Sequence, residues 1–453
     1  MGQQRSNFSS KIGFVLAAAG SAVGLGNIWR FPYLAAQYGG GTFLLTYLIL
    51  VATFGFTLMI AETAIGRKTG LSAIEAYGKL NKRFSFVGFL TALIPILILP
   101  YYSVIGGWVT KYLVVFATGG IHNAASDSFF GNFISSFGES GAFFFIFVAV
   151  TAIIVFFGVQ KGVEAVSKFM MPVLVVLTLV IAIYVLTIDG AMEGVVYYLK
   201  PDFKNFTMKT FVAAMGQMFY SMSLAMGIMV TYGSYMKKEN HLETSVRQIE
   251  LFDTGFAFLS GLMIIPAIFA LEGGIVENKG AGLMFVVLPQ VFEKMALGGV
   301  IGALFFVLVL LAALTSSISL METIVSFFMD KFNWTRKFTC IIVALGSLAM
   351  GVPSILGYGI WDHIHLFGNP STNILDIFDF VSNSILMPIV AFFTCILVGF
   401  IIKPKTISDE VKETNGIFKS EKLFTIMIKW IAPVFLLIIL GSSLLEALGI
   451  FKL

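Results

Sequence analysis

Long apolar runs are the feature that most constrains how this chain can fold. Eleven of them recur along its 453 residues, at 12–36, 41–65, 86–118, 143–157, 170–188, 211–236, 254–271, 296–328, 338–352, 378–402 and 423–448. Most are long enough to cross a bilayer as a helix, and lipid-exposed backbone must satisfy its own hydrogen bonds. With 58% hydrophobic and 12% charged residues, too little polar material remains to cover a soluble globule. We therefore expect one domain, an all-α membrane protein with eleven transmembrane helices.

Lysine and arginine positions predict the orientation of the chain. If the N-terminus is cytoplasmic, 20 of the 29 basic residues fall in cytoplasmic segments, as the positive-inside rule requires. Eleven crossings then place the C-terminus outside the cell, in a multi-pass protein of the cell (inner) membrane. The same bias accounts for the net charge of +4, so we expect the lipid bilayer and no nucleic acid as a partner. The sequence predicts no oligomeric state.

Catalytic motifs do not appear in this sequence. It contains no HExxH, no P-loop and no Ser/His/Asp set at membrane depth, which argues against an intramembrane protease, an ATP-driven pump or any other enzyme. Cys340 and Cys395 fall inside apolar runs and are expected to be free, buried thiols. His363 and His365 have no third ligand in view, so a metal site there is not expected.

Two of the apolar runs are interrupted. The run 12–36 contains GSAVGLGNIWRFP, whose glycines weaken a helix and which brings Arg30 to membrane depth. The run 211–236 is interrupted by polar residues around 220–227. Discontinuous helices at matching places in two halves indicate an inverted-repeat transporter with its site at the midplane. Close packing through small residues explains either run alone, but the repetition five runs later favours the transporter.

Interrupted helices free backbone groups that can bind ions. Carbonyls and neutral side-chain oxygens suit sodium, and the positive end of a half-helix suits a carboxylate. Such oxygens come from Asn27, Ser221, Ser223, Thr315 and Ser316. Four acids within or near apolar runs are further candidates, because a carboxylate in lipid needs a partner or a proton: Glu62, Asp253, Asp376 and Asp379. A bound cation would neutralise Asp253, and Arg30 would pair with one of the two outer aspartates.

Three of these segments resemble a known family. GSAVGLGNIWRFPY, the GQMFYSMSL of the sixth run and the LTSSIS of the eighth closely resemble the neurotransmitter:sodium symporters, and among them the bacterial eleven-helix amino-acid transporters of the leucine-transporter fold. The similarity runs from Arg5 to about Lys403. It implies a 5+5 inverted repeat with broken helices 1 and 6, over approximately 11–188 and 209–402, followed by an extra helix at 423–448.

The resemblance also implies two sodium sites and one substrate site. The first sodium site would use Ala22, Asn27, Ser221, Asp253 and the substrate carboxylate. The second would use Gly20, Val23, Ala312, Thr315 and Ser316. The substrate carboxylate would meet the amides of Leu25 and Gly26 and the Tyr102 hydroxyl, and the amine would meet carbonyls of Ala22, Tyr220 and Ser221, with Ser223 nearby. The side-chain pocket would be lined by Ile98, Tyr220, Met226, Ser316 and Leu320.

Three positions bear on specificity within that family. Gly24 stands where monoamine carriers have an aspartate for the substrate amine, so an amino acid is favoured over an amine. Met226 stands where the leucine carrier has phenylalanine, and a flexible thioether leaves more room than a ring. We therefore expect neutral aliphatic and aromatic side chains, with an aromatic preference. Chloride-dependent relatives place an anion near the positions that match Asn27, Tyr47, Gln217 and Ser221, and chloride-independent relatives carry a carboxylate nearby. Ala257 stands where the leucine carrier has that glutamate, but Asp253 already supplies a fixed negative charge, so we expect no chloride requirement.

The resemblance extends to the gates. Arg30 and Asp379 would form the outer ion pair above Tyr102 and Tyr220, and Arg5 and Asp330 would form the inner pair. Gly162 and Pro172 match a motif linked to unwinding of the fifth helix, which would expose the second sodium site to the cytoplasm. Ordinary helix entry and a tolerated proline kink are the alternatives for these two residues.

Together these features predict a sodium-coupled symporter of neutral hydrophobic L-amino acids, working by alternating access with two sodium ions and no chloride. A carrier of amines or other zwitterions is one alternative. A sodium-dependent amino-acid sensor that does not transport is the other, and it would be supported by a large cytoplasmic signalling domain, which the sequence does not contain.

Overall fold

The computed structural model describes residues 7–273, 281–365, 372–414 and 416–447, which form helices, turns and loops without a strand. Up to the middle of the chain the elements are α1 (Lys11–Ala22), η1 (Gly26–Arg30), α2 (Phe31–Gln37), α3 (Gly41–Leu50), η2 (Val51–Gly55), α4 (Phe56–Thr69), α5 (Ala73–Leu80), η3 (Lys82–Phe84), α6 (Ser85–Ala117), α7 (Ile121–Ala124), α8 (Asp127–Ser135), α9 (Phe137–Phe156), η4 (Val159–Glu164), α10 (Ala165–Leu186) and α11 (Ala191–Leu199).

The remaining elements are η5 (Phe203–Asn205), α12 (Met208–Ser221), α13 (Ile228–Ser234), α14 (Leu242–Glu272), η6 (Leu283–Val287), α15 (Leu288–Lys294), α16 (Gly298–Phe332), α17 (Arg336–Leu356), α18 (Ile374–Asp379), η8 (Phe380–Leu386), α19 (Met387–Ile396), η9 (Leu397–Ile401), α20 (Pro404–Lys412), α21 (Glu421–Ile426), η10 (Met427–Ile431) and α22 (Ala432–Ala447).

The membrane spans agree with the all-helical prediction. Among the described residues, nine helices are long and apolar enough to cross a bilayer, and the pair Lys11–Ala22 and Gly26–Gln37, bent by 54°, makes a tenth span. The predicted count of eleven also requires α12 and α13 to form one interrupted span. Residues 222–227 separate these two short helices, so the eleventh span stays a prediction.

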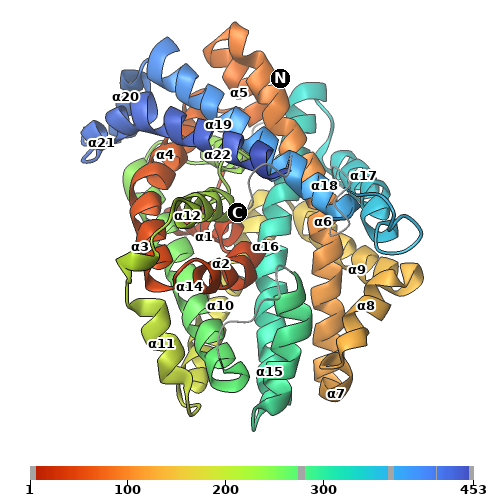
Figure 1. Cartoon of the computed structure of the whole chain (residues 1–453). Helices are drawn as coiled ribbons and strands as arrows, with labels where there is room; N and C mark the ends of the chain where they lie inside the picture. Colours follow the sequence, from red (N-terminus) through yellow and green to blue (C-terminus); the bar gives the residue numbers. More distant parts are fainter. Residues whose placement is uncertain (1–6, 274–280, 366–371, 415, 448–453) are drawn as a thin grey trace.

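The loops lie at two opposite ends of the molecule. Figure 1 shows α7, α11 and α15 at one end and α5 and α20 at the other. The helix α5 precedes the span α6 and α7 follows it, so the two lie at opposite ends, as they must when that span crosses once. The end that carries α5 and α20 is the one that the lysine and arginine positions predict to be cytoplasmic.

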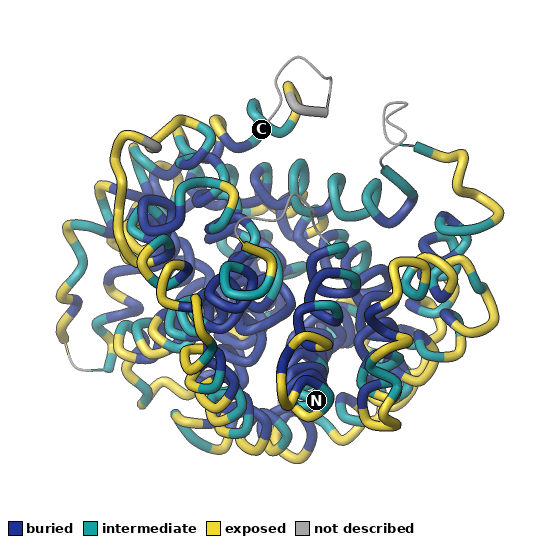
Figure 2. The backbone as a smooth tube through the Cα atoms, turned by 60° about the horizontal axis from the view of Figure 1, so that its bottom comes forward, coloured by how far each residue is buried: buried dark blue, intermediate teal, exposed yellow. Residues whose placement is uncertain are grey.

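The spans pack around α16, which contacts α1, α6, α9 and α10, while α13 packs against α4 and α12 against α3. Buried segments gather in the middle of the molecule and exposed ones at its rim (Figure 2). Large apolar side chains such as Ile183, Phe169 and Leu251 lie on that rim, 63%, 69% and 73% exposed. Such a surface is suited to lipid, and it leaves the polar residues of the broken spans inside.

A buried ion pair fixes the end that carries α20. The Arg67 Nε atom lies 2.8 Å from Glu410 Oε1, with the two side chains 0% and 2% exposed. Arg67 also donates to the Asn240 carbonyl at 2.9 Å, and Lys238 approaches the same Glu410 oxygen at 2.7 Å. The cluster therefore joins the end of α4 to α20 and to the loop before α14.

We predict that Arg67→Met lowers the free energy of unfolding by about 3 kcal/mol, because it leaves the buried Glu410 carboxylate with a single half-exposed partner. Lys331→Met is the control, since Lys331 pairs with Glu75 at 3.0 Å with side chains 51% and 38% exposed; it should change stability by less than about 1 kcal/mol. Thermal unfolding in detergent measures both, and equal losses would contradict the assignment.

Candidate functional site

The first broken span opens its backbone at the centre of the molecule. The helix α1 ends at Ala22, Val23 is extended with φ −74° and ψ 99°, and η1 begins at Gly26. The Leu25 amide, freed by this break, donates to the Tyr102 hydroxyl of α6 at 3.4 Å. Backbone groups at such a depth need partners, and here a neighbouring span supplies one.

The second break lies between α12 and α13. Ser223, Ala225 and Gly227 have φ of 52°, 61° and 76°, a left-handed conformation that is costly for the first two. The Ala225 amide donates to the Glu62 carboxylate at 2.7 Å. Glu62, a candidate from sequence, thus joins this break to α4, while its second oxygen has no hydrogen-bond partner among the described residues.

Asp253 lies at the centre of a buried oxygen cluster. Its carboxylate accepts hydrogen bonds from Asn27 Nδ2 at 2.7 Å and Ser221 Oγ at 2.8 Å, and the Tyr47 hydroxyl lies 3.4 Å from its other oxygen. Asn27 Oδ1 in turn accepts from the Gly24 amide at 3.2 Å. Among the described residues no lysine or arginine forms an ion pair with Asp253. The side chains predicted for the first sodium site therefore surround a fully buried carboxylate whose partners are neutral.

A second oxygen cluster lies between α1 and α16. The Ser316 hydroxyl is 3.5 Å from the carbonyls of both Gly20 and Val23. The Thr315 hydroxyl donates to the Ala312 carbonyl at 3.0 Å. The structure thus gathers the residues predicted for the second sodium site, and their ion-binding role stays a prediction. Uncharged hydroxyl and carbonyl oxygens are ligands that suit a small hard cation.

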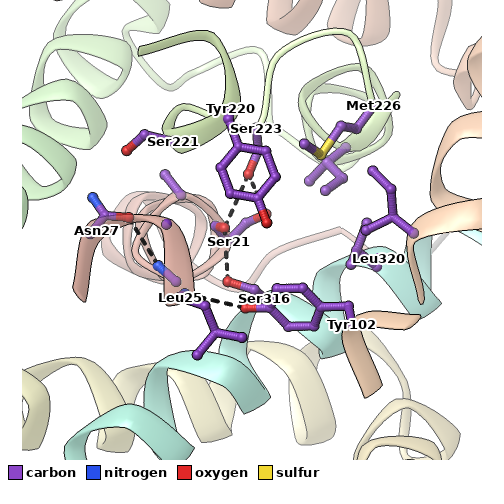
Figure 3. Close-up of a pocket in the computed structure, with 15 residues that line it drawn as sticks. Ser21, Leu25, Asn27, Tyr102, Tyr220, Ser221, Ser223, Met226, Ser316 and Leu320 are labelled. Carbon is purple, nitrogen blue, oxygen red and sulfur yellow. Dashed lines mark hydrogen bonds between the residues drawn. The ribbon is translucent and has the colours of Figure 1, made fainter. Parts of the chain in front are cut away.

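A cavity of about 30 Å³ separates the two breaks. Every residue predicted to contact the substrate lines it: Ala22, Leu25, Gly26, Ile98, Tyr102, Tyr220, Ser221, Ser223, Met226, Ser316 and Leu320. In Figure 3, Asn27 and Leu25 lie toward one side of the cavity, and Met226 and Leu320 lie toward the opposite side. The cavity is therefore polar at one end and apolar at the other, with room for about two water molecules.

Sequence reasoning did not include Ser21 in the site. Its carbonyl accepts hydrogen bonds from Ser223 Oγ at 3.0 Å and from Ser316 Oγ at 3.1 Å (Figure 3). These bonds join α1 to the break between α12 and α13 and to α16. Ile228, at the start of α13, also lines the cavity without having been predicted. Ser21 lies inside the interrupted motif GSAVGLGN, so the sequence could have identified it as a residue of the site. No sequence feature distinguishes Ile228 in this way.

The predicted outer ion pair is not closed in this structure. No nitrogen–oxygen distance within 4 Å joins Arg30 to Asp379, although the structure describes both; the Arg30 guanidinium instead lies 5.2 Å from the centre of the Tyr220 ring. Asp379 accepts hydrogen bonds from the Tyr101 hydroxyl at 3.0 Å and from Asn383 Nδ2 at 2.6 Å. An aromatic face attracts a guanidinium, so Arg30 covers Tyr220, and its pairing with Asp379 stays a prediction.

The predicted inner pair is described in part. Arg5 lies outside the described residues, and Asp330 accepts hydrogen bonds from the Ser72 amide at 2.8 Å and from the Ser72 hydroxyl. In the fifth span, Gly162 lies in the π-helical η4 and Pro172 inside α10. A Cβ at Gly162 would lie 2.0 Å from the Ile154 carbonyl oxygen. The span is helical at both residues here, and its unwinding stays a prediction.

Comparisons with known proteins give one consistent result. The sequence model of the sodium:neurotransmitter symporter family matches residues 5–130 and 128–449. A Bacillus subtilis protein described as the uncharacterized sodium-dependent transporter YhdH is 36% identical, over 96% of this chain and 97% of the relative. A Haemophilus influenzae protein described as an uncharacterized sodium-dependent transporter is 32% identical, over 98% and 99%. The crystal structure of MhsT in complex with L-phenylalanine is similar with a TM-score of 0.88 and 37% identity, covering 97% of this chain and 100% of that one.

Gly24 gives a direct test of the cavity geometry. A Cβ at this position would lie 2.5 Å from Ser316 Oγ and 3.1 Å from the Tyr102 hydroxyl. We expect Gly24→Ala to lower the free energy of unfolding by about 1–3 kcal/mol, as overpacking does. In a Ser316→Ala background the closest contact is removed, so the added cost should fall by about 1 kcal/mol. Thermal unfolding of the four variants of this cycle gives the coupling, and strict additivity would contradict the contact.

Proposed function

This chain belongs to the sodium:neurotransmitter symporter family and is a sodium-dependent membrane transporter, and we propose that it couples sodium entry to the uptake of neutral hydrophobic L-amino acids. The observation that carries this proposal is the two-ended cavity. Its polar end offers the Leu25 and Gly26 amides and the Tyr102 hydroxyl, and its apolar end offers Ile98, Met226 and Leu320. A zwitterion with an apolar side chain matches both ends.

Sodium coupling is supported by the oxygen clusters beside the cavity. Asp253 is a buried carboxylate held by neutral donors, and a cation bound there would supply the missing positive charge. Ala22 and Ser221 line the cavity, and the Ser221 hydroxyl also donates to Asp253. A substrate carboxylate would therefore complete the shell of the first sodium ion, and each ligand would bind more tightly when the other is present.

The second cluster supports a second sodium ion. Its oxygens come from α1 and α16, two elements that pack directly against each other. A cation there would hold the broken span against α16, and its release would let them separate. Alternating access would then use two gates. Arg30, which lies over Tyr220, would belong to the outer gate, and Asp330 would belong to the inner gate.

Position 24 favours amino acids over amines. A side chain at Gly24 would collide with Ser316 and Tyr102, so an aspartate for a substrate amine has no space there. The MhsT structure similar to this one was solved with L-phenylalanine, which supports an aromatic preference here. Met226 and Leu320 can change rotamer to admit such a side chain.

Chloride independence is supported by what surrounds Asp253. The hydroxyls of Tyr47 and Ser221 and the amide of Asn27 already face its carboxylate. An anion added to these donors would lie beside a fixed negative charge in a buried site, where like charges repel strongly.

The direct test measures uptake in proteoliposomes. We expect labelled phenylalanine and leucine to accumulate only under an inward sodium gradient, and competition across the twenty amino acids should favour the neutral hydrophobic ones. Potassium replaces sodium in the control. Uptake or binding that ignores sodium would refute the coupling, and sodium-dependent binding without accumulation would indicate a sensor.

Asp253→Asn tests the first sodium site. Removing the charge should raise the sodium concentration for half-maximal uptake at least tenfold, or make uptake depend on chloride, because a mobile anion would replace the lost carboxylate. Glu250→Gln is the matched control on the same helix, since Glu250 pairs with Arg247 at 3.2 Å instead of facing the cluster. Normal sodium and chloride responses in Asp253→Asn would remove Asp253 from the site.

A further inference from the structure

A groove of about 520 Å³ that several charged side chains line lies at the end of the molecule that carries α20. One wall is formed by η9 and α20, and the other by α21 and η10. Figure 1 shows α20 and α21 close together at the edge of this end. The groove thus opens where the spans leave the membrane, on the side predicted to be cytoplasmic.

Four lysines line the groove: Lys403, Lys405, Lys412 and Lys429. Lys412 pairs with Glu421 across it at 2.7 Å. In the described part of the chain, no carboxylate comes within 4 Å of Lys403, Lys405 or Lys429. Asp409 also lines the groove. With four lysines against two acids, the groove has a net positive charge and attracts an anion.

Lys429 is the member that most needs an explanation. It lies eight residues into the span Glu421–Leu445, roughly 12 Å below its start. An ammonium at that depth is costly in lipid, and side chains so placed reach toward the interface or toward a partner. Its Nζ atom lies 5.8 Å from the centre of the Phe400 ring and 5.7 Å from that of Trp430. These rings hold the charge at the wall of the groove.

The backbone conformation of Lys403 is a second, independent observation in favour of a ligand in the groove. It connects η9 to α20 with φ 66°, a conformation that glycine adopts at lower cost. A lysine in this strained conformation is consistent with a use for its side chain.

The surface beside the groove is apolar. Ile401 of η9, Ile426 of α21 and Trp430 of η10 are 47%, 53% and 62% exposed, and each follows directly in sequence a residue that lines the groove. A ligand that fits both parts has a negatively charged head and a hydrocarbon tail. A free phosphate would use the lysines alone and leave this apolar surface without a role.

We propose that this groove binds an anionic phospholipid of the leaflet on the α20 side, with its phosphate near Lys403, Lys405 and Lys429 and its acyl chains along Ile401, Ile426 and Trp430. The site lies apart from the transport cavity, and its existence does not depend on which substrate is carried.

Native mass spectrometry of the full chain in a neutral detergent tests the proposal, with phosphatidylglycerol as the probe. The unmodified protein should retain one tightly bound phosphatidylglycerol and release phosphatidylcholine. Lys403→Gln and Lys429→Gln should each weaken retention roughly fivefold, and the double variant about 25-fold, because a lysine near an anionic lipid surface contributes a factor of that size. Lys429→Arg keeps the charge and should retain the lipid.

Lys337→Gln is the matched control. Lys337 lies on the same predicted side, with its Nζ atom 5.8 Å from the centre of the Phe156 ring, but it does not line the groove. It should leave lipid retention unchanged. Equal weakening by Lys337→Gln, equal retention of phosphatidylcholine, or displacement of the lipid by millimolar inorganic phosphate would each overturn the proposal. Unchanged thermal unfolding of each variant without lipid excludes a folding defect as the cause of the loss.

Discussion

A helix that is interrupted in the middle of a membrane protein must find partners for the backbone groups it releases, and much of this structure follows from that requirement. The two breaks, after Ala22 and after Ser221, each depend on side chains from other spans. Tyr102 and Ser316 meet the first break, and Glu62 meets the second. The partners come from distant parts of the sequence, so the breaks can form only once the spans have packed together.

This dependence also explains why the oxygen clusters proposed for sodium lie beside the cavity proposed for the substrate. The carbonyls of Gly20 and Val23 face Ser316 of α16, while Asn27, just beyond the break, donates to Asp253. A coupling between ligands then needs no long pathway through the protein. Such coupling would require only that one short, unwound segment contacts both the proposed sodium ion and the proposed substrate.

The sequence predicted the helical architecture, and the residues predicted to contact the substrate line one cavity, although their roles stay predictions. Apolar runs give the spans, although α9 begins at Phe137 rather than 143, because polar Glu139 and Ser140 continue the helix toward the surface. The motif residues could be placed because the interruption itself is local. Contacts between distant residues could not be predicted in the same way: Arg30 lies over the Tyr220 ring, a contact that no sequence pattern indicates, and its pairing with Asp379 stays a prediction. The Glu62 contact with Ala225 also needed the structure, since no pattern shows which span approaches a break.

The small volume of the central cavity has a consequence for affinity. A space of about 30 Å³ cannot admit an amino acid until Tyr220, Met226 or their neighbours move. The conformation described here is therefore one member of an equilibrium. A ligand can bind only to the fraction of molecules whose cavity is wider. The apparent affinity equals the intrinsic affinity multiplied by that fraction. A substitution that merely loosens the contact between Arg30 and Tyr220 could thus strengthen binding without touching the ligand, by making the receptive conformation more common.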